Sequence, residues 1–394
     1  MSARLTTVAR GLLAPIYVPW MGMSLCLGMV SVALPLYLTE IGLGYLALSA
    51  VLTAAGVGSM VGGVPAGDGV ARLGERWMLA GGIGMLCVTT VLLAASDQFA
   101  VLVLLQFIAG VGAIAIRLSG QTWIARSAER TIRGRLLSAM GGLRRFGAFL
   151  GPLLAGLSIE WFGFTVTFAI AGALAGAGLL PILATADRVP PSTLHDRLPL
   201  RDVFARHWRR LLVVTSGPVL IMAARRGRAV VLPLIGDDLG LSPVAVGVLV
   251  SISTGADLLL FPIAGYLMDS FGRLKAIVPA FTLMGLGLFA LALADGGLLV
   301  ALSGALIGVG NGLSSGTMMT LGTDLAPEDS TSQFLAGFAT LQDWGQVFGP
   351  LIVGWVAAGI GLSASAAALG LIILLGVVLI VRTVGETRLS PADA

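Results

Sequence analysis

The sequence predicts an all-α membrane protein whose twelve transmembrane helices form two pseudo-symmetric six-helix bundles. Three observations predict this fold: the apolar composition, the length of the apolar runs and an internal repeat. Of the 394 residues, 57% are hydrophobic and only 11% are charged, whereas a soluble domain carries about 25% charged residues. A water-facing exterior needs polar cover and a lipid-facing exterior does not, so the composition excludes a soluble globular protein.

Twelve apolar runs are long enough to cross a bilayer as helices, which takes about 20 residues each. The runs are continuously apolar rather than alternating, so they do not fit the strands of a closed β-barrel. The predicted spans are residues 12–38, 45–67, 77–95, 99–125, 136–159, 164–184, 211–235, 243–267, 276–294, 298–323, 333–358 and 363–382.

The distribution of charge predicts the orientation of these spans. With the N-terminus in the cytoplasm, 18 of the 24 Lys and Arg residues face the cytoplasm, 6 lie within spans and none lies outside. The external connections carry only acids: Glu40, Asp97, Glu160, Asp237, Asp238 and Asp295. We therefore expect an integral plasma (inner) membrane protein with cytoplasmic N- and C-termini. The excess of basic residues then reflects topology and anionic inner-leaflet lipid, not nucleic acid.

The two halves of the chain align without gaps at a constant offset of 198 residues, the signature of an internal repeat. Matching pairs are Gly42 with Gly240, Gly67 with Gly265, Gly74 with Gly272, Gly110 with Gly308, Gly151-Pro152 with Gly349-Pro350, and Gly163 with Gly361. The alignment predicts an N-terminal bundle over residues 1–184 and a C-terminal bundle over 211–394. The polar, proline-containing residues 185–210 are expected to form a cytoplasmic linker, with a short surface helix near 201–210.

A loop between the eighth and ninth spans, residues 265–275, reads GYLMDSFGRLK. It resembles the loop signature of the major facilitator superfamily, which implies alternating access between two rocking halves. The resemblance implies a cytoplasmic gate in which Asp269 pairs with Arg273 or with a neighbouring helix end. The first-half copy departs from the pattern, because Ala71 and Glu75 replace the aspartate and the first arginine. We expect Asp68 to substitute there, so the predicted gate residues are Asp68, Arg72, Arg76, Asp269 and Arg273.

The fifth span carries glycines around a proline and resembles the motif of the drug:proton antiporter branch of that superfamily. Proline bends a helix and glycine allows another helix to approach closely. A looser copy occurs in the eleventh span. The predicted helix-packing residues are Gly147, Gly151, Pro152 and Gly156, with Gly345, Gly349 and Pro350 in the second half.

Six arginines lie within predicted spans, where each charge costs about 2.5–3.5 kcal/mol on insertion scales. They are Arg117, Arg144, Arg145, Arg225, Arg226 and Arg228. In one interpretation they line an aqueous cavity and bind an anionic solute, since a guanidinium group suits carboxylate and phosphate oxygens. In the other they pair with Asp257, Asp343 or span-end carbonyls and only hold the bundle together.

Because two aspartates cannot pair six arginines, we expect at least two arginines to line the cavity. Asn311, Gln342 and Trp344 are predicted as further substrate contacts. Asp257 and Asp343 are the predicted proton carriers. Of the two, Asp257 is expected to titrate more freely, because Asp343 has arginines as plausible partners.

These features predict a proton-coupled secondary transporter that exports an amphipathic or anionic organic solute, and not an enzyme. The alternatives are an importer or exchanger of organic anions and a flippase for lipids or lysolipids. Cys26 and Cys87 form no metal-ligand spacing, and no nucleotide-binding loop occurs, so we expect no metal, no cofactor and no direct use of ATP. The expected partners are a small-molecule substrate, protons and membrane lipids, and the protein is expected to be a monomer.

Overall fold

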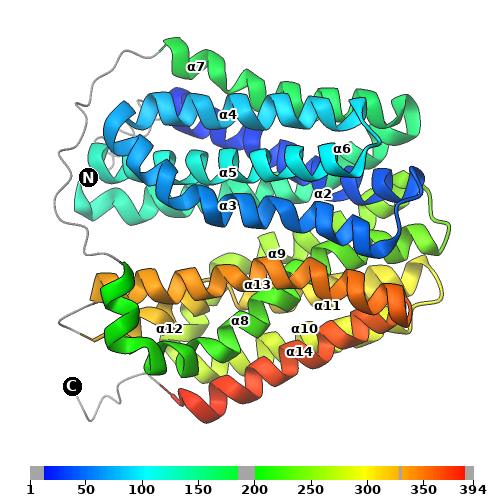
Figure 1. The fold of residues 1–394 in the computed structure, drawn as a ribbon. Coiled ribbons are helices and arrows are strands. Elements are labelled where there is room, and N and C mark those ends of the chain that lie inside the picture. Colours follow the sequence, from blue (N-terminus) through cyan, green and yellow to red (C-terminus); the bar gives the residue numbers. More distant parts are fainter. Residues whose placement is uncertain (1–12, 185–199, 328–330, 387–394) are drawn as a thin grey trace. The chain divides into compact units, whose positions relative to one another are not determined.

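The computed structural model describes residues 13–184, 200–327 and 331–386, and these residues are almost entirely helical (Figure 1). In chain order the elements are a π-helical turn η1 (Leu13–Tyr17), α2 (Val18–Glu40), α3 (Tyr45–Leu73), α4 (Glu75–Leu92), a short 3-10 turn η2 (Leu93–Ala95), α5 (Phe99–Ser127), α6 (Arg130–Ala177), α7 (Leu179–Ala184), α8 (Leu200–Asp238), α9 (Pro243–Phe271), α10 (Arg273–Ala292), α11 (Gly297–Leu313), α12 (Thr317–Leu325), α13 (Thr331–Gly359) and α14 (Leu362–Thr383).

Nine segments of the described residues are long and apolar enough to cross a membrane. They are Pro15–Glu40, Tyr45–Leu73, Glu75–Ala95, Phe99–Ser127, Thr131–Ala184, Pro243–Phe271, Arg273–Ala292, Gly297–Leu325 and Leu362–Thr383. One of them, Thr131–Ala184, has 54 residues, about 80 Å of helix, which is enough for two crossings. It kinks at Gly163, where φ is 75°, so it contains both the fifth and the sixth predicted spans.

The seventh and eleventh predicted spans lie in α8 and α13, which are helices of 39 and 29 residues. Neither belongs to the nine apolar segments. The reason lies in their polar residues: α8 carries Arg225, Arg226 and Arg228 close together, and α13 carries Asp343 between glutamines. These two helices therefore hold four of the five charged residues that the sequence analysis placed inside the second half, and Asp257 of α9 is the fifth.

The chain divides into two compact units. Unit 1 comprises Met1–Leu43, Ala50–His195 and Ser242–Ser251, and unit 2 comprises Gly44–Ser49, Asp196–Leu241 and Ile252–Ala394. The first turn of α3 and the first turns of α9 thus belong to the unit of the other half. Most of the predicted linker, residues 185–199, lies outside the described residues. Its remainder, 200–210, is helical and continuous with α8 rather than a separate short helix.

The 198-residue repeat recurs in the backbone geometry. Gly42 and Gly240 have φ of 77° and 70°, and Gly74 and Gly272 have φ of 84° and 102°. These values lie in the left-handed region that glycine adopts at little cost. Gly163 and Gly361 form a third matched pair, at 75° and 130°. The turns that end corresponding helices are therefore built in the same way in both halves, as the sequence alignment predicted.

The packing inside each unit follows the repeat as well. In unit 1, α2 packs along α6 and α4 packs along α5; in unit 2, α8 packs along α13 and α10 along α11. A methyl group on Gly110 of α5 would overlap the carbonyl oxygen of Ala55. One on Gly308 of α11 would overlap that of Ser253, at the corresponding position of α9. Close approach through glycine is thus conserved between the halves.

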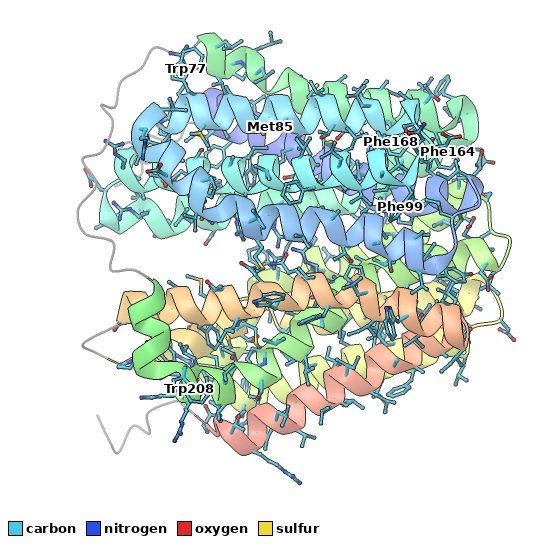
Figure 2. All side chains as sticks on the ribbon, in the orientation of Figure 1. Trp77, Met85, Phe99, Phe164, Phe168 and Trp208 are labelled. Atoms are coloured by element: carbon cyan, nitrogen blue, oxygen red, sulfur yellow. The ribbon has the colours of Figure 1, made fainter. Side chains whose placement is uncertain are left out.

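Aromatic residues fill one end of unit 1. The ring of Tyr37 lies 5.5 Å from that of Phe164 and 5.6 Å from that of Phe168. Figure 2 shows the two phenylalanines together at one end of the unit, and Trp77 at the other end, where α4 begins. The end of each unit that contains Gly74 or Gly272 is called the loop end below.

The two halves differ at the tenth predicted span. The sequence predicts one continuous helix over 298–323, but the structure divides it into α11 and α12 at residues 314–316. Gly316 has φ of 80°. The counterpart of this segment in the first half, α5, is a single helix of 29 residues. Since the matching part of α5 is uninterrupted, this break is a local departure from the symmetry.

Candidate functional site

At the loop end of unit 1, two of the predicted gate residues contact each other. Arg72 Nε lies 2.9 Å from Asp68 Oδ2, and both side chains are well exposed. Arg76 binds elsewhere: its Nε and Nη2 donate to the carbonyl oxygens of Ile182 and Leu183 at 3.0 and 2.9 Å. These carbonyls lie at the end of α7, so Arg76 caps the last helix of the half.

At the loop end of unit 2, Arg273 connects two acids. Its Nη1 lies 3.3 Å from Asp269 Oδ1, and its Nε lies 3.0 Å from Asp324 Oδ2 at the end of α12. Glu386, which follows α14, accepts hydrogen bonds from the backbone amides of Arg273 and Leu274 at 2.8 and 3.0 Å. The start of α10 is therefore held both by α12 and by the chain after α14.

A shorter and more buried ion pair at the loop end of unit 1 involves two residues that the sequence analysis did not select. Arg126 Nη1, near the end of α5, lies 2.6 Å from Glu75 Oε1, whose side chain is only 5% exposed. A signal existed in the repeat, because Glu75 corresponds to Arg273 and Arg126 corresponds to Asp324. A charge reversal at one position, matched by the opposite reversal at another, indicates that the two positions contact each other.

The glycine–proline motif of α6 lies against α2, as its small residues require. A methyl group on Gly147 would come within 2.5 Å of Ser24, and one on Gly151 within 2.6 Å of Gly28. Gly156 lies against the carbonyl of Pro243, the first residue of α9, within the same unit. Pro152 lies inside α6.

The second copy of the motif packs in the same manner. In α13, Gly345 lies against the carbonyl oxygen of Val219 and Gly349 against that of Ala223 on α8, with Pro350 inside the helix. Both copies thus bring the fifth helix of a half onto its first.

The three arginines of the first half differ in exposure. Arg117 of α5 and Arg144 of α6 are exposed, whereas Arg145 is half-buried and donates to the carbonyl oxygen of Gly141 in its own helix at 3.4 Å. Arg117 lies about 15 Å along the helix axis from the end of α5, and Arg144 about 21 Å from the start of α6. Both exposed guanidinium groups are therefore well inside the apolar length of their helices.

In the second half, Arg226 and Asp343 are connected by a residue that the sequence analysis missed. Arg226 Nη2 donates to Gln346 Oε1, and Gln346 Nε2 donates to Asp343 Oδ1. Gln346 is three residues from Asp343, on the same face of α13, so helical spacing could have identified it. The arginine and the aspartate belong to one hydrogen-bonded chain between α8 and α13.

Arg225 and Arg228 point to different neighbours. Arg225 Nη2 donates to Ser314 Oγ at 2.8 Å, and the Asn311 carbonyl oxygen lies 3.4 Å away. Arg228 Nη1 lies 3.4 Å from Ser253 Oγ of α9. The structure thus brings the predicted residues Arg225 and Asn311 together, through the backbone of the latter.

Asp257 and Asn311 lie near each other, because Gly312, the residue after Asn311, packs against the backbone of Asp257. Asp257 of α9 and Asn311 of α11 are each only 8% exposed. Gln342 of α13 has an Nε2 atom that is buried without a hydrogen-bond partner among the described residues. Trp344 is 40% exposed and stacks on Phe348, with ring centroids 5.8 Å apart.

The sequence matches the model of the Major Facilitator Superfamily over residues 21–224 and 214–393, which together cover nearly the whole chain. A curated relative is the "multi-drug resistance efflux pump PmrA homolog" of Lactococcus lactis subsp. lactis (strain IL1403), which is 24% identical over 263 residues. That match spans 65% of this chain and 65% of the relative.

Solved structures match over almost the whole length. A mutant form of the nucleoside transporter NupG superposes with a TM-score of 0.80 at 13% identity, over 95% of this chain and 100% of the other. A D-xylose-proton symporter gives 0.74 at 17% identity, over 96% and 99%. The inward-open xylose transporter XylE from E. coli gives 0.73 at 17% identity, over 95% and 96%. At these identities the likeness concerns the fold, and it confirms the predicted all-helical architecture.

Proposed function

Because this chain belongs to the Major Facilitator Superfamily, we propose that it is a secondary transporter that exports an amphipathic or anionic organic compound in exchange for protons. The family consists of transporters rather than enzymes, and their substrates are small molecules. The chain is accordingly an integral membrane protein with multiple spans. We further propose that both termini lie in the cytoplasm.

The observation that carries the proposal is the exposure of arginines deep inside apolar helices. Three of these arginines have exposed side chains: Arg117 and Arg144 in unit 1, and Arg226 in unit 2. A guanidinium group that faced lipid at this depth would cost about 2.5–3.5 kcal/mol or more, and it cannot lose its proton. An aqueous pathway avoids this cost. An anion in that pathway would gain charge-assisted hydrogen bonds from the same groups.

Two further observations support export of an amphipathic compound. The curated relative is named as an efflux pump, and the glycine–proline motif of α6 is packed as the resemblance to drug:proton antiporters implies. The stacked, partly exposed rings of Trp344 and Phe348, one helical turn apart, offer an apolar surface on the helix that also carries Gln346. A substrate with one charged and one aromatic part suits this combination.

Asp257 is the first choice for the proton-coupling group. It is buried in α9, and acids inside membrane helices are costly and usually functional. Asp343 accepts a hydrogen bond from Gln346, which in turn accepts one from Arg226. We therefore propose that Asp257 takes up and releases the proton, and that Asp343 orients Arg226 through Gln346.

The experiment uses purified protein in proteoliposomes, with anilinonaphthalene sulfonate as an anionic amphipathic probe and ethidium as a cationic one. A lumen more acidic than the outside should drive accumulation of the anionic probe, because protons leave as the probe enters. Accumulation only when the outside is the more acidic would indicate symport and hence uptake. Probe movement that requires a second anion and ignores the pH gradient would indicate exchange. Movement of a labelled lysolipid without movement of either dye would indicate a flippase.

Matched variants test the residues. Arg144→Gln should weaken transport of the anionic probe at least tenfold, whereas Arg135→Gln should not, although Arg135 is exposed on the same helix. Equal transport by both variants would remove Arg144 from the pathway. Asp257→Asn should abolish accumulation driven by the pH gradient while probe exchange continues. Driven accumulation at the normal rate in that variant would reject Asp257 as the proton carrier.

A further inference from the structure

The break between α11 and α12 lies in the middle of an apolar segment, Gly297–Leu325. A break in a helix leaves carbonyl groups without their usual amide partners. Inside a membrane these groups must find partners in the protein, because lipid offers none. The carbonyl groups of residues 311–317 therefore need hydrogen-bond donors from within the protein.

Side chains around the break supply the missing donors. Thr317 Oγ1 donates to the carbonyl oxygen of Ser314 at 2.8 Å, and Ser314 Oγ donates to that of Asn311 at 3.0 Å. The third donor comes from another helix: Arg225 Nη2 lies 2.8 Å from Ser314 Oγ and 3.4 and 3.5 Å from the carbonyl oxygens of Asn311 and Ser314. The guanidinium group of Arg225 thus reaches both Asn311 and Ser314, at the carbonyl end of α11.

The surroundings of Arg225 are built for a planar cation. Its guanidinium carbon lies 5.2 Å from the centre of the Phe281 ring, and Phe281 is fully buried. An aromatic face attracts a cation, more strongly where water is excluded. The carbonyl end of α11 adds a partial negative charge of about half an electron. Ring and carbonyls together form a site whose charge and shape fit guanidinium.

We infer that Arg225 is a tethered cation that caps the carbonyl end of α11 at this break and thereby fixes the direction in which α12 continues, and that it is a positioning residue rather than a substrate ligand. Carbonyls at interrupted membrane helices commonly coordinate a free cation in transporters. Here the cation is part of the protein and is permanently charged. The inference does not depend on the proposed substrate, because it concerns the conformation of the broken helix.

Arg228 provides a matched comparison. It lies on the same face of α8 as Arg225 and is also half-buried, and its Nη1 lies 3.4 Å from Ser253 Oγ of α9, whereas Arg225 contacts Ser314 at the break. Replacing Arg228 should therefore leave the relation of α11 to α12 unchanged. The corresponding positions of the first half need no such cation, because α5 continues through them without interruption.

The experiment measures the distance between spin labels on both sides of the break. In a background with Cys26→Ser and Cys87→Ser, labels at Leu302→Cys on α11 and Met319→Cys on α12, both exposed positions, report the distance by pulsed dipolar spectroscopy. Arg225→Ala should broaden the distribution. Millimolar guanidinium chloride should narrow it again, and sodium chloride at the same concentration should not. Adding Ser314→Ala to Arg225→Ala should abolish this rescue.

An unchanged distribution in Arg225→Ala would overturn the inference, as would a broadened one that guanidinium does not restore. Broadening of the same size in Arg228→Ala would overturn it too, because the effect would then be general to α8. If Arg225→Ala does not fold, Arg225→Lys carries the measurement. Lysine keeps the charge but lacks the planar fork, so a broadened distribution is expected and a wild-type distribution would contradict the inference.

Discussion

The loop ends of the two units use the same ion pair with the charges exchanged. In unit 1 the acid Glu75 begins α4 and the base Arg126 lies near the end of α5. In unit 2 the base Arg273 begins α10 and the acid Asp324 lies at the end of α12. Glu75 and Arg273 are 198 residues apart in the sequence, and so are Arg126 and Asp324. The architecture therefore requires an ion pair at this place, but not a particular sign at either end.

The exchange has an electrostatic consequence. The start of a helix favours a negative charge and its end a positive one, so the pair in unit 1 is favourable to both helices and the pair in unit 2 to neither. Unit 2 has a compensating acid, because Glu386 accepts hydrogen bonds from the first two amides of α10. Glu386 thus supplies at the start of α10 the negative charge that Glu75 supplies at the start of α4.

The largest expected effect comes from copying the second arrangement into the first half. Glu75→Arg alone should lower stability by about 3 kcal/mol, because it breaks a largely buried ion pair and places two arginines together. That corresponds to a thermal midpoint about 6–12 °C lower. Glu75→Arg combined with Arg126→Asp should recover all but about 1 kcal/mol, and the remainder reflects the unfavourable dipoles.

Thermal unfolding of the purified protein in detergent checks this prediction, and Arg126→Asp alone is the second single variant. If the double variant is no more stable than either single variant, the two pairs are not equivalent. The comparison between the halves would then hold for sequence position only.

A smaller effect is expected where both halves bring their first and fifth helices together. Gly151→Ala and Gly349→Ala should each lower stability by about 1–3 kcal/mol, since the added methyl group meets backbone and not a flexible side chain. Gly142→Ala is the control on the same helix as Gly151, because nothing lies within 4 Å of its added methyl group. Thermal midpoints decide the result, and an unaffected Gly349→Ala would show that only the first half depends on this contact.

The features that repeat or recur were predictable from the sequence, and the features that depend on partners were not. The apolar runs follow from the requirements of lipid. The alignment paired Gly74 with Gly272, but their left-handed backbone was found only in the structure. The partner of Glu75 lies 51 residues away, and nothing local to either residue identifies it. The predicted span 298–323 is found as one apolar segment, Gly297–Leu325. Its break at residues 314–316 has no counterpart in the continuous α5, so the repeat could not reveal it.

The sequence predicted which residue types form the site, but not the direction in which each side chain points. Arginines deep in spans were evident from the sequence, but helical spacing alone cannot say that Arg226 is exposed while Arg225 reaches the break in span ten. That difference depends on which neighbour lies opposite each face of α8. Gln346 is an exception: it was not selected, but its spacing of three residues from Asp343 was enough to predict their contact.

A still smaller effect is expected at Glu386. Glu386→Gln keeps an acceptor for the amides of α10 but removes the charge, so stability should fall by about 0.5–1 kcal/mol at low salt. The loss should shrink as salt is added, because the carboxylate is exposed and screened. Asp97→Asn, at an exposed acid on the opposite end of unit 1, is the control. A loss that does not depend on salt would contradict the dipole explanation and favour lost packing.

The smallest effect is expected at the exposed pair of unit 1. Arg72 and Asp68 are 75% and 44% exposed, and exposed pairs one helical turn apart contribute no more than about 0.5 kcal/mol. Asp68→Asn should therefore leave the thermal midpoint within about 2 °C of the wild type. Asp269→Asn should cost more, because Asp269 shares Arg273 with Asp324 in a three-charge cluster. If Asp68→Asn instead slows probe transport at an unchanged thermal midpoint, Asp68 acts in the conformational change, as the predicted gate requires. If neither the thermal midpoint nor transport changes, the gate of the first half depends on Glu75 and Arg126 instead.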